Sequence, residues 1–100
     1  MKIIIGARQS GKTTELIKQS ASEDLYIVCM NRCCVDHIMM IARHLNLQIP
    51  MPITFEDFLH KRYYGRGIKG FLIDDLDMLL YHMSMVPIKT VSMSTNKGLI

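Results

Sequence analysis

Short apolar runs alternate with amphipathic segments along this chain. Four runs rich in β-branched or aromatic residues predict buried strands, at 2–5, 25–30, 71–73 and 88–93. Alternation of strands with helical segments is typical of a parallel sheet with helices on both faces. The predicted fold is therefore α/β, a three-layer α/β/α arrangement around a short parallel sheet of about four strands. Residues 1–100 are expected to form a single domain.

The segments between these runs have helical patterns. Helices are predicted at about 12–22, 35–47, 54–64 and 76–83. The second of them has the clearest apolar stripe, made by Val35, Ile38, Met39, Ala42 and Leu45. Thr54 is expected to cap the third helix, and Pro50 and Pro52 indicate a turn before it.

Composition narrows the possible classes of protein. With 49% hydrophobic residues the chain can build one core, and a formal net charge of +3 does not by itself indicate nucleic-acid binding. Cys29, Cys33 and Cys34 fit neither a disulfide framework nor a zinc pattern, so we expect buried thiols in a reducing compartment. No apolar run approaches membrane-spanning length. We expect a cytoplasmic protein without membrane contact, in which nine methionines fill the core or a sticky surface.

The chemistry is concentrated between the first predicted strand and the first predicted helix. There the run Gly6-Ala7-Arg8-Gln9-Ser10-Gly11-Lys12-Thr13 has the spacing G-x-x-x-x-G-K-T of a phosphate-binding loop. Its glycines let the backbone wrap an anion, and its amides and the helix dipole point at that anion. Lys12 is expected to reach the β- and γ-phosphates, and Thr13 to hold Mg²⁺. Residues 6–13, with Thr14, are thus expected to bind ATP or another NTP; the alternative is a glycine turn that merely links strand to helix.

Two acids follow the predicted strand 71–73. In P-loop enzymes the first acid at this place holds the Mg²⁺ shell, so Asp74 is expected to be a metal ligand together with Thr13. Asp75 is the candidate catalytic base and, with Lys12, a candidate catalytic residue. ATP-hydrolysing relatives usually have Glu at this position, and the shorter Asp predicts slow turnover. The alternative is that these acids cap the next helix.

With both motifs in place, the chain resembles the additional-strand class of P-loop NTPases. Met30-Asn31-Arg32-Cys33-Cys34 resembles the segment of superfamily-one helicases that touches single-stranded DNA, and Pro52-Ile53-Thr54-Phe55-Glu56-Asp57-Phe58 resembles their T-F-x-x-F segment. That match covers the first half of one motor domain. The whole pattern is also similar to small P-loop proteins of phages of Gram-positive bacteria. The resemblance implies a slow ATPase in phage or mobile-element DNA metabolism, in the cytoplasm of a bacterial host.

Two other functions remain open. The chain has no second motor domain to supply an arginine finger, so the alternative is a non-hydrolysing P-loop binding module that modulates a host replication or defence protein. The run Gly11-Lys12-Thr13-Thr14-Glu15-Leu16-Ile17 also resembles the start of thymidine kinases with a zinc-bound lasso, which would imply a small-molecule kinase. The later Cys ligands of that family have no counterpart here.

Several polar positions bear on partners. The strand order of the resembled class would expose the apolar run 2–5 as a sheet edge, which we expect a second copy or a protein partner to cover. Single-stranded nucleic acid is a candidate ligand for a basic and aromatic pattern, made by Lys61, Arg62, Tyr63, Tyr64, Arg66 and Lys69. The alternative is a solvated helix end.

Asn96 is a candidate sensor of the terminal phosphate or part of a terminal polar loop. Surface or hydrogen-bonded roles, without metal, are expected for His37, His44, His60 and His82.

Overall fold

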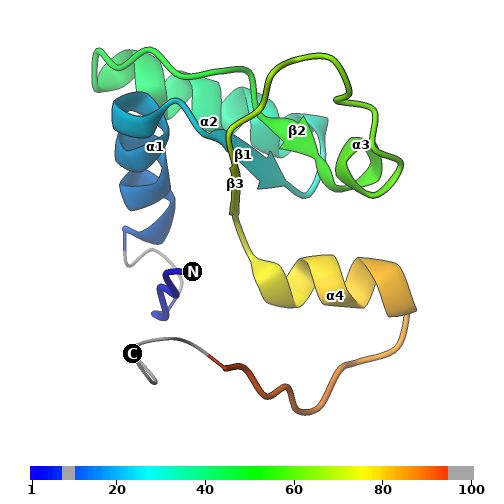
Figure 1. Ribbon diagram of the computed structural model, residues 1–100. Coiled ribbons are helices and arrows are strands. Elements are labelled where there is room, and N and C mark those ends of the chain that lie inside the picture. Colours follow the sequence, from blue (N-terminus) through cyan, green and yellow to red (C-terminus); the bar gives the residue numbers. More distant parts are fainter. Residues whose placement is uncertain (8–10, 95–100) are drawn as a thin grey trace.

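The centre of the fold is a parallel sheet. The computed structural model describes residues 1–7 and 11–94 (Figure 1). Within them, three strands lie in the order β2-β1-β3, namely β1 (Tyr26–Cys29), β2 (Ile53–Thr54) and β3 (Phe71–Ile73). Val28 at the centre of β1 is in register with Ile53 on one side and Ile73 on the other. The parallel pairing confirms the predicted α/β class.

Four helices accompany this sheet in the described part of the chain: α1 (Lys12–Glu23), α2 (Arg32–His44), α3 (Phe55–Leu59) and α4 (Leu76–Ser84). Helix α2 begins earlier than its apolar stripe because the Asn31 side chain caps it, accepting a hydrogen bond from Cys34 N at 3.0 Å. Thr54 caps α3 as predicted, since its Oγ1 accepts from Asp57 N at 3.2 Å. The predicted extension of α3 to residue 64 is wrong: the helix ends at Leu59, and Lys61 takes a left-handed φ of 57°.

Helices cover both faces of the sheet, because successive residues of β1 point to opposite faces. On one face, Ile27 and Cys29 pack with buried residues of α1 and α2, among them Ile17 and Ile38. On the other face, Val28 packs with Phe55 of α3 and Leu79 of α4. The clustered residues are at most 9% exposed. The sheet has few strands but is buried on both faces. Helices α2 and α4 begin at the carboxyl ends of its strands β1 and β3.

The strands predicted at 2–5 and 88–93 are wrong for this structure, since neither segment is a strand. Ile5 is 83% exposed, and Ile88 and Val91 are 47% and 57% exposed. Figure 1 shows the residues after α4 running along that helix and not along β3. Within the described residues β3 therefore pairs with β1 alone, and the apolar run 2–5 has no neighbouring strand to accept its hydrogen bonds. The exposed sheet edge belongs to β3 and not to residues 2–5.

One strand was missed from the sequence. Pro50 and Pro52 indicate a turn, yet the next two residues, Ile53 and Thr54, pair with Val28 and Cys29. A strand this short carries no alternation of its own, so its position was fixed by the partner strand.

Candidate phosphate and magnesium site

The start of α1 has two features that favour a bound anion. Gly11 is the N-cap of this helix and has a φ of 85°, in the left-handed region that glycine adopts without steric cost. Gly11 has no side chain to cap the helix, and the N–H groups of a first helical turn have no partner within the helix itself. These N–H groups and the positive end of the helix dipole favour an anion at this point. Arg8, Gln9 and Ser10 of the predicted loop lie outside the described residues.

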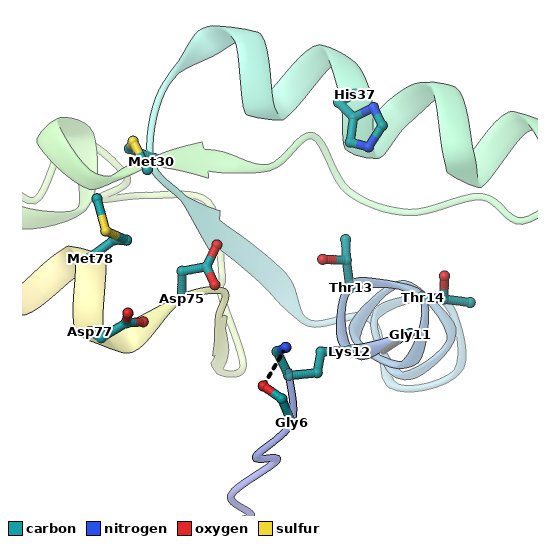
Figure 2. Close-up of a pocket in the computed structure, with 10 residues that line it drawn as sticks. All are labelled: Gly6, Gly11, Lys12, Thr13, Thr14, Met30, His37, Asp75, Asp77 and Met78. Atoms are coloured by element: carbon teal, nitrogen blue, oxygen red, sulfur yellow. Dashed lines mark hydrogen bonds between the residues drawn. The ribbon is translucent and has the colours of Figure 1, made fainter. Parts of the chain in front are cut away.

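Lys12 holds the two ends of the loop together. Its Nζ donates a hydrogen bond to the carbonyl oxygen of Gly6 at 2.8 Å (Figure 2). A second bond goes to the carbonyl oxygen of Ala7 at 2.5 Å. The ammonium group of the predicted phosphate ligand thus lies at the loop itself, next to the first turn of α1.

A second contact brings the two sequence motifs together. Thr13 Oγ1 donates to Asp74 Oδ2 at 3.4 Å, across 61 positions of the chain. Asp74 is itself fixed at the end of β3, because its backbone N–H donates to Val28 O of β1 at 2.9 Å. The two side chains predicted to hold Mg²⁺ therefore lie at one place.

The electrostatics of Asp74 favour an added cation. Burial raises the pKa of this carboxyl above its ordinary 3.8, and the charge of Asp75 raises the pKa further. The hydrogen bond from Thr13 and the charge of Lys12 act in the opposite direction. The carboxylate is thus short of compensating positive charge, which a bound divalent cation supplies.

The donor set fits Mg²⁺. A hydroxyl and a carboxylate are hard oxygen ligands, and Mg²⁺ commonly takes one or two from the protein and the rest from water and substrate phosphates. Over residues 1–7 and 11–94, no three His, Cys, Asp or Glu side chains gather as a candidate metal cage. A metal held by Thr13 and Asp74 would need phosphate and water to complete its shell, which is consistent with a metal that arrives with a nucleotide.

Asp75 occupies the N-cap position of α4, but its carboxylate makes no capping hydrogen bond. Its backbone has a φ of 58°, a left-handed conformation that costs energy for a residue with a Cβ. The alternative from the sequence, that this side chain caps the helix, is therefore not what the structure shows. The carboxylate lines the cavity next to the loop.

A cavity of about 710 Å³ adjoins these groups, lined by Gly6, Gly11, Lys12, Thr13, Thr14, Met30, His37, Asp75, Asp77 and Met78. In Figure 2 the loop residues lie on one side of Asp75, and Met30, Met78 and Asp77 lie on the other. The His37 side chain lies on α2, above Thr13 in this view. From the sequence, His37 was expected to have a surface or hydrogen-bonded role, and the methionines to fill the core or an apolar surface. The one available signal was the place of His37 beside the apolar stripe of α2.

The basic and aromatic pattern at 61–69 is largely engaged within the protein. Arg62 Nη1 lies 3.2 Å from Asp57 Oδ1 and 3.9 Å from Glu56 Oε1. Lys69 Nζ lies 3.9 Å from Asp24 Oδ2. The Tyr63 ring packs against Phe58 and Phe71, whereas Tyr64 is 79% exposed. These contacts fit the alternative, a solvated helix end, better than a surface on which the bases of a single strand would stack.

The cysteines are free thiols, as predicted, but they are not all buried. Cys29 is buried and Cys33 is exposed. Burial, with the nearby Cys34 and Asp74, raises the pKa of Cys29 to about 12. Asn96, the candidate phosphate sensor, lies outside the described residues.

No protein-family model, curated protein or solved structure matches this chain. Across the described ranges, no helix has the length and apolarity to cross a membrane. The described residues form an α/β fold around a parallel sheet of three strands.

Proposed function

We propose that the protein binds a nucleoside triphosphate with Mg²⁺ and hydrolyses it slowly, in phage or mobile-element DNA metabolism. The phosphates would lie on residues 6–14, and Thr13 and Asp74 would hold the metal. The observation that carries this proposal is the 3.4 Å contact between Thr13 Oγ1 and Asp74 Oδ2. Two motifs that lie far apart in the sequence meet there, at the start of a helix whose N-cap residue makes no side-chain hydrogen bond.

Each described side chain has a role in this proposal. Lys12, now bonded to Gly6 and Ala7, offers its ammonium group to the phosphates. Bound Mg²⁺ would neutralise charge on the β- and γ-phosphates. Asp75 lies in the same cavity and would orient the attacking water through its carboxylate. Its short side chain and strained backbone are expected to make hydrolysis slow.

The test is Mg²⁺-dependent phosphate release from ATP, with and without single-stranded DNA. Lys12→Ala should abolish release, whereas Lys18→Ala should not, because Lys18 lies exposed on the same helix and does not line the cavity. Stimulation by DNA would support a role in strand handling. If ATP and Mg²⁺ bind neither wild type nor Lys18→Ala, the proposal fails.

A second candidate is a non-hydrolysing nucleotide-binding module that modulates a host replication or defence protein. The left-handed backbone of Asp75 favours it, because a carboxylate on a short side chain and a strained backbone is poorly placed to activate water. ATP binding without any turnover in wild type would support this candidate. Turnover that disappears in Asp75→Asn, with ATP affinity retained, would instead support the hydrolase.

A further inference from the structure

The sheet has an open edge at β3. The backbone of this strand bonds to β1 at alternate residues, as parallel pairing requires. Gly70 O accepts from Tyr26 N at 3.3 Å. Asp74 N donates to Val28 O at 2.9 Å. Leu72, midway between Gly70 and Asp74, faces β1 in the same register. The two intervening residues therefore turn their N–H and C=O groups the other way, toward the free edge.

Those outward groups belong to Phe71 and Ile73. Over the described residues, neither forms a backbone hydrogen bond with a segment outside the sheet. Both line a cavity of about 430 Å³, which has α1, residues 1–4 and Met93 among its other walls. The described chain thus leaves space along this edge, and four backbone groups face it.

An open edge of this kind accepts an added strand. The opposite edge of the sheet is protected, because prolines at 50 and 52 precede β2 and offer no N–H for pairing. No proline lies within or beside β3. The wall of the cavity made by residues 1–4 is loosely held, since residues 1–5 form no backbone hydrogen bond with another described segment and Ile5 is 83% exposed.

The segment around β3 is complementary to itself in the antiparallel direction. Residues 69–75 read Lys-Gly-Phe-Leu-Ile-Asp-Asp, with a cation at one end and two carboxylates at the other. When two copies pair antiparallel with their Leu72 residues opposite each other, Lys69 of each copy comes to Asp75 of the other. Lys69 is available for this contact, because its present neighbour is Asp24 at 3.9 Å and both side chains are 70% exposed.

The same register matches the open backbone groups. Phe71 of one copy lies opposite Ile73 of the other, so each outward N–H meets an outward C=O and four hydrogen bonds form across the pair. In each copy these two side chains pack on the face of the sheet that holds Phe55. Gly70 lies opposite Asp74 and, having no side chain, does not crowd that carboxylate.

We propose that the β3 edge binds the β3 edge of a second copy of this chain, so that two sheets of three strands join into one of six. A second copy is favoured over another extended chain because the charged ends of the segment 69–75 complement each other in this register. Residues 1–4 move outward to admit the second copy. The inference does not depend on the proposed function.

The experiment is sedimentation equilibrium of the full chain over a wide range of concentrations, at low and high salt. Wild type should form a dimer that weakens as salt is added. Lys69→Glu should weaken this dimer about two- to thirtyfold, because it removes two exposed ion pairs. Combining it with Asp75→Lys exchanges the charges and should restore the dimer. Arg66→Glu is the matched control, since Arg66 is exposed and does not line the cavity.

Amide hydrogen exchange followed by NMR locates the contact. The N–H groups of Phe71 and Ile73 should exchange slowly only at concentrations where the dimer forms. The N–H of Leu72, which faces β1, should exchange slowly at every concentration.

Four results would overturn the inference. The first is a monomer at all concentrations, and the second is a dimer in which Phe71 and Ile73 exchange fast. The third is slow exchange of both residues in the monomer, because a segment of the same chain then covers the edge. The fourth is an equal loss of dimer in Lys69→Glu and Arg66→Glu, which would exclude the proposed register.

Discussion

Thr13 Oγ1 lies 3.4 Å from Asp74 Oδ2, and this contact joins the first turn of α1 to the end of β3. The two residues belong to motifs 61 positions apart. Without a ligand the hydroxyl serves as hydrogen-bond donor to the carboxylate. With a metal both oxygens would turn toward the same ion, so one pair of side chains has a part in both states.

Replacement of Asp74 should reveal a stability cost at this site. Its folded pKa is raised above 3.8, so the folded state favours the protonated form. The associated stability is fully present below the unfolded pKa and is lost as pH rises through the folded pKa. Asp74→Asn is neutral at every pH and keeps an acceptor for Thr13, so it should be more stable than wild type at neutral pH. Urea denaturation should show the difference shrinking as pH falls from neutral toward 3.8, with little further change below that value.

The control for that experiment is Asp77→Asn, since Asp77 is exposed. At neutral pH this variant should change the free energy of unfolding much less than Asp74→Asn does. An Asp74→Asn protein that is less stable than wild type at neutral pH would contradict the electrostatic account.

The Thr13 hydroxyl should control the metal dependence of nucleotide binding. Thr13→Ala should weaken ATP binding in the presence of Mg²⁺ about ten- to hundredfold, the usual worth of a polar contact to a charged group. ATP binding in EDTA should change little. Thr13→Ser keeps the hydroxyl and should retain the Mg²⁺ effect in titration calorimetry. Equal losses with Mg²⁺ and with EDTA would show that Thr13 acts through the fold of the loop.

Ser20 should be the serine of α1 that matters most for stability. It is fully buried, and its Oγ donates to Leu25 O at 2.6 Å, which ties the end of α1 to the chain entering β1. Ser20→Ala leaves that carbonyl without this donor and should lower the free energy of unfolding by about 1–3 kcal/mol. Ser22→Ala removes an exposed bond to Gln19 O and should cost less than about 0.5 kcal/mol. Similar losses in the two variants would refute this ranking.

The thiols should react in the order of their exposure. Cys33 is exposed, whereas Cys29 is buried and has a pKa of about 12, so little thiolate forms there near neutral pH. Titration with a thiol reagent should label Cys33 quickly and Cys29 only after urea is added. Peptide mapping identifies the labelled residue. Rapid labelling of Cys29 in the native protein would show that its strand opens.

Local signals were enough to predict the elements that bury a periodic face or carry a cap. Helix α1, strand β1, strand β3 and helix α4 all lie where the sequence placed them, and Thr54 caps α3 as expected. Thr13 and Asp74 were predicted to hold one Mg²⁺ from the pattern of P-loop enzymes, and the two side chains do meet, although the strand expected at 2–5 is absent from the described structure.

Long-range pairing was not predictable in the same way. The run 2–5 has the composition of a strand, but a strand also needs a neighbour, and the residues after α4 do not provide one. Strand β2 shows the converse, because a two-residue segment beside prolines becomes a strand where β1 offers it a partner. His37 and Met78 line the same cavity because α2 and α4 approach the same end of the sheet. Local sequence patterns do not predict this approach of two helices.

The two hydrogen bonds from Lys12 to backbone carbonyl oxygens compete with any anion that binds the same ammonium group. An anion that takes over these two N–H groups of the ammonium must replace the Gly6 and Ala7 oxygens, and loses part of what it gains from the charge. Measured affinity is then the difference between two sets of contacts, and an ion with few charged oxygens gains little from the exchange. A polyphosphate can exceed this threshold because it contacts the lysine, the helix amides and a metal together. Selectivity for long phosphate chains over chloride or orthophosphate would thus require no contact between a side chain and the rest of the ligand.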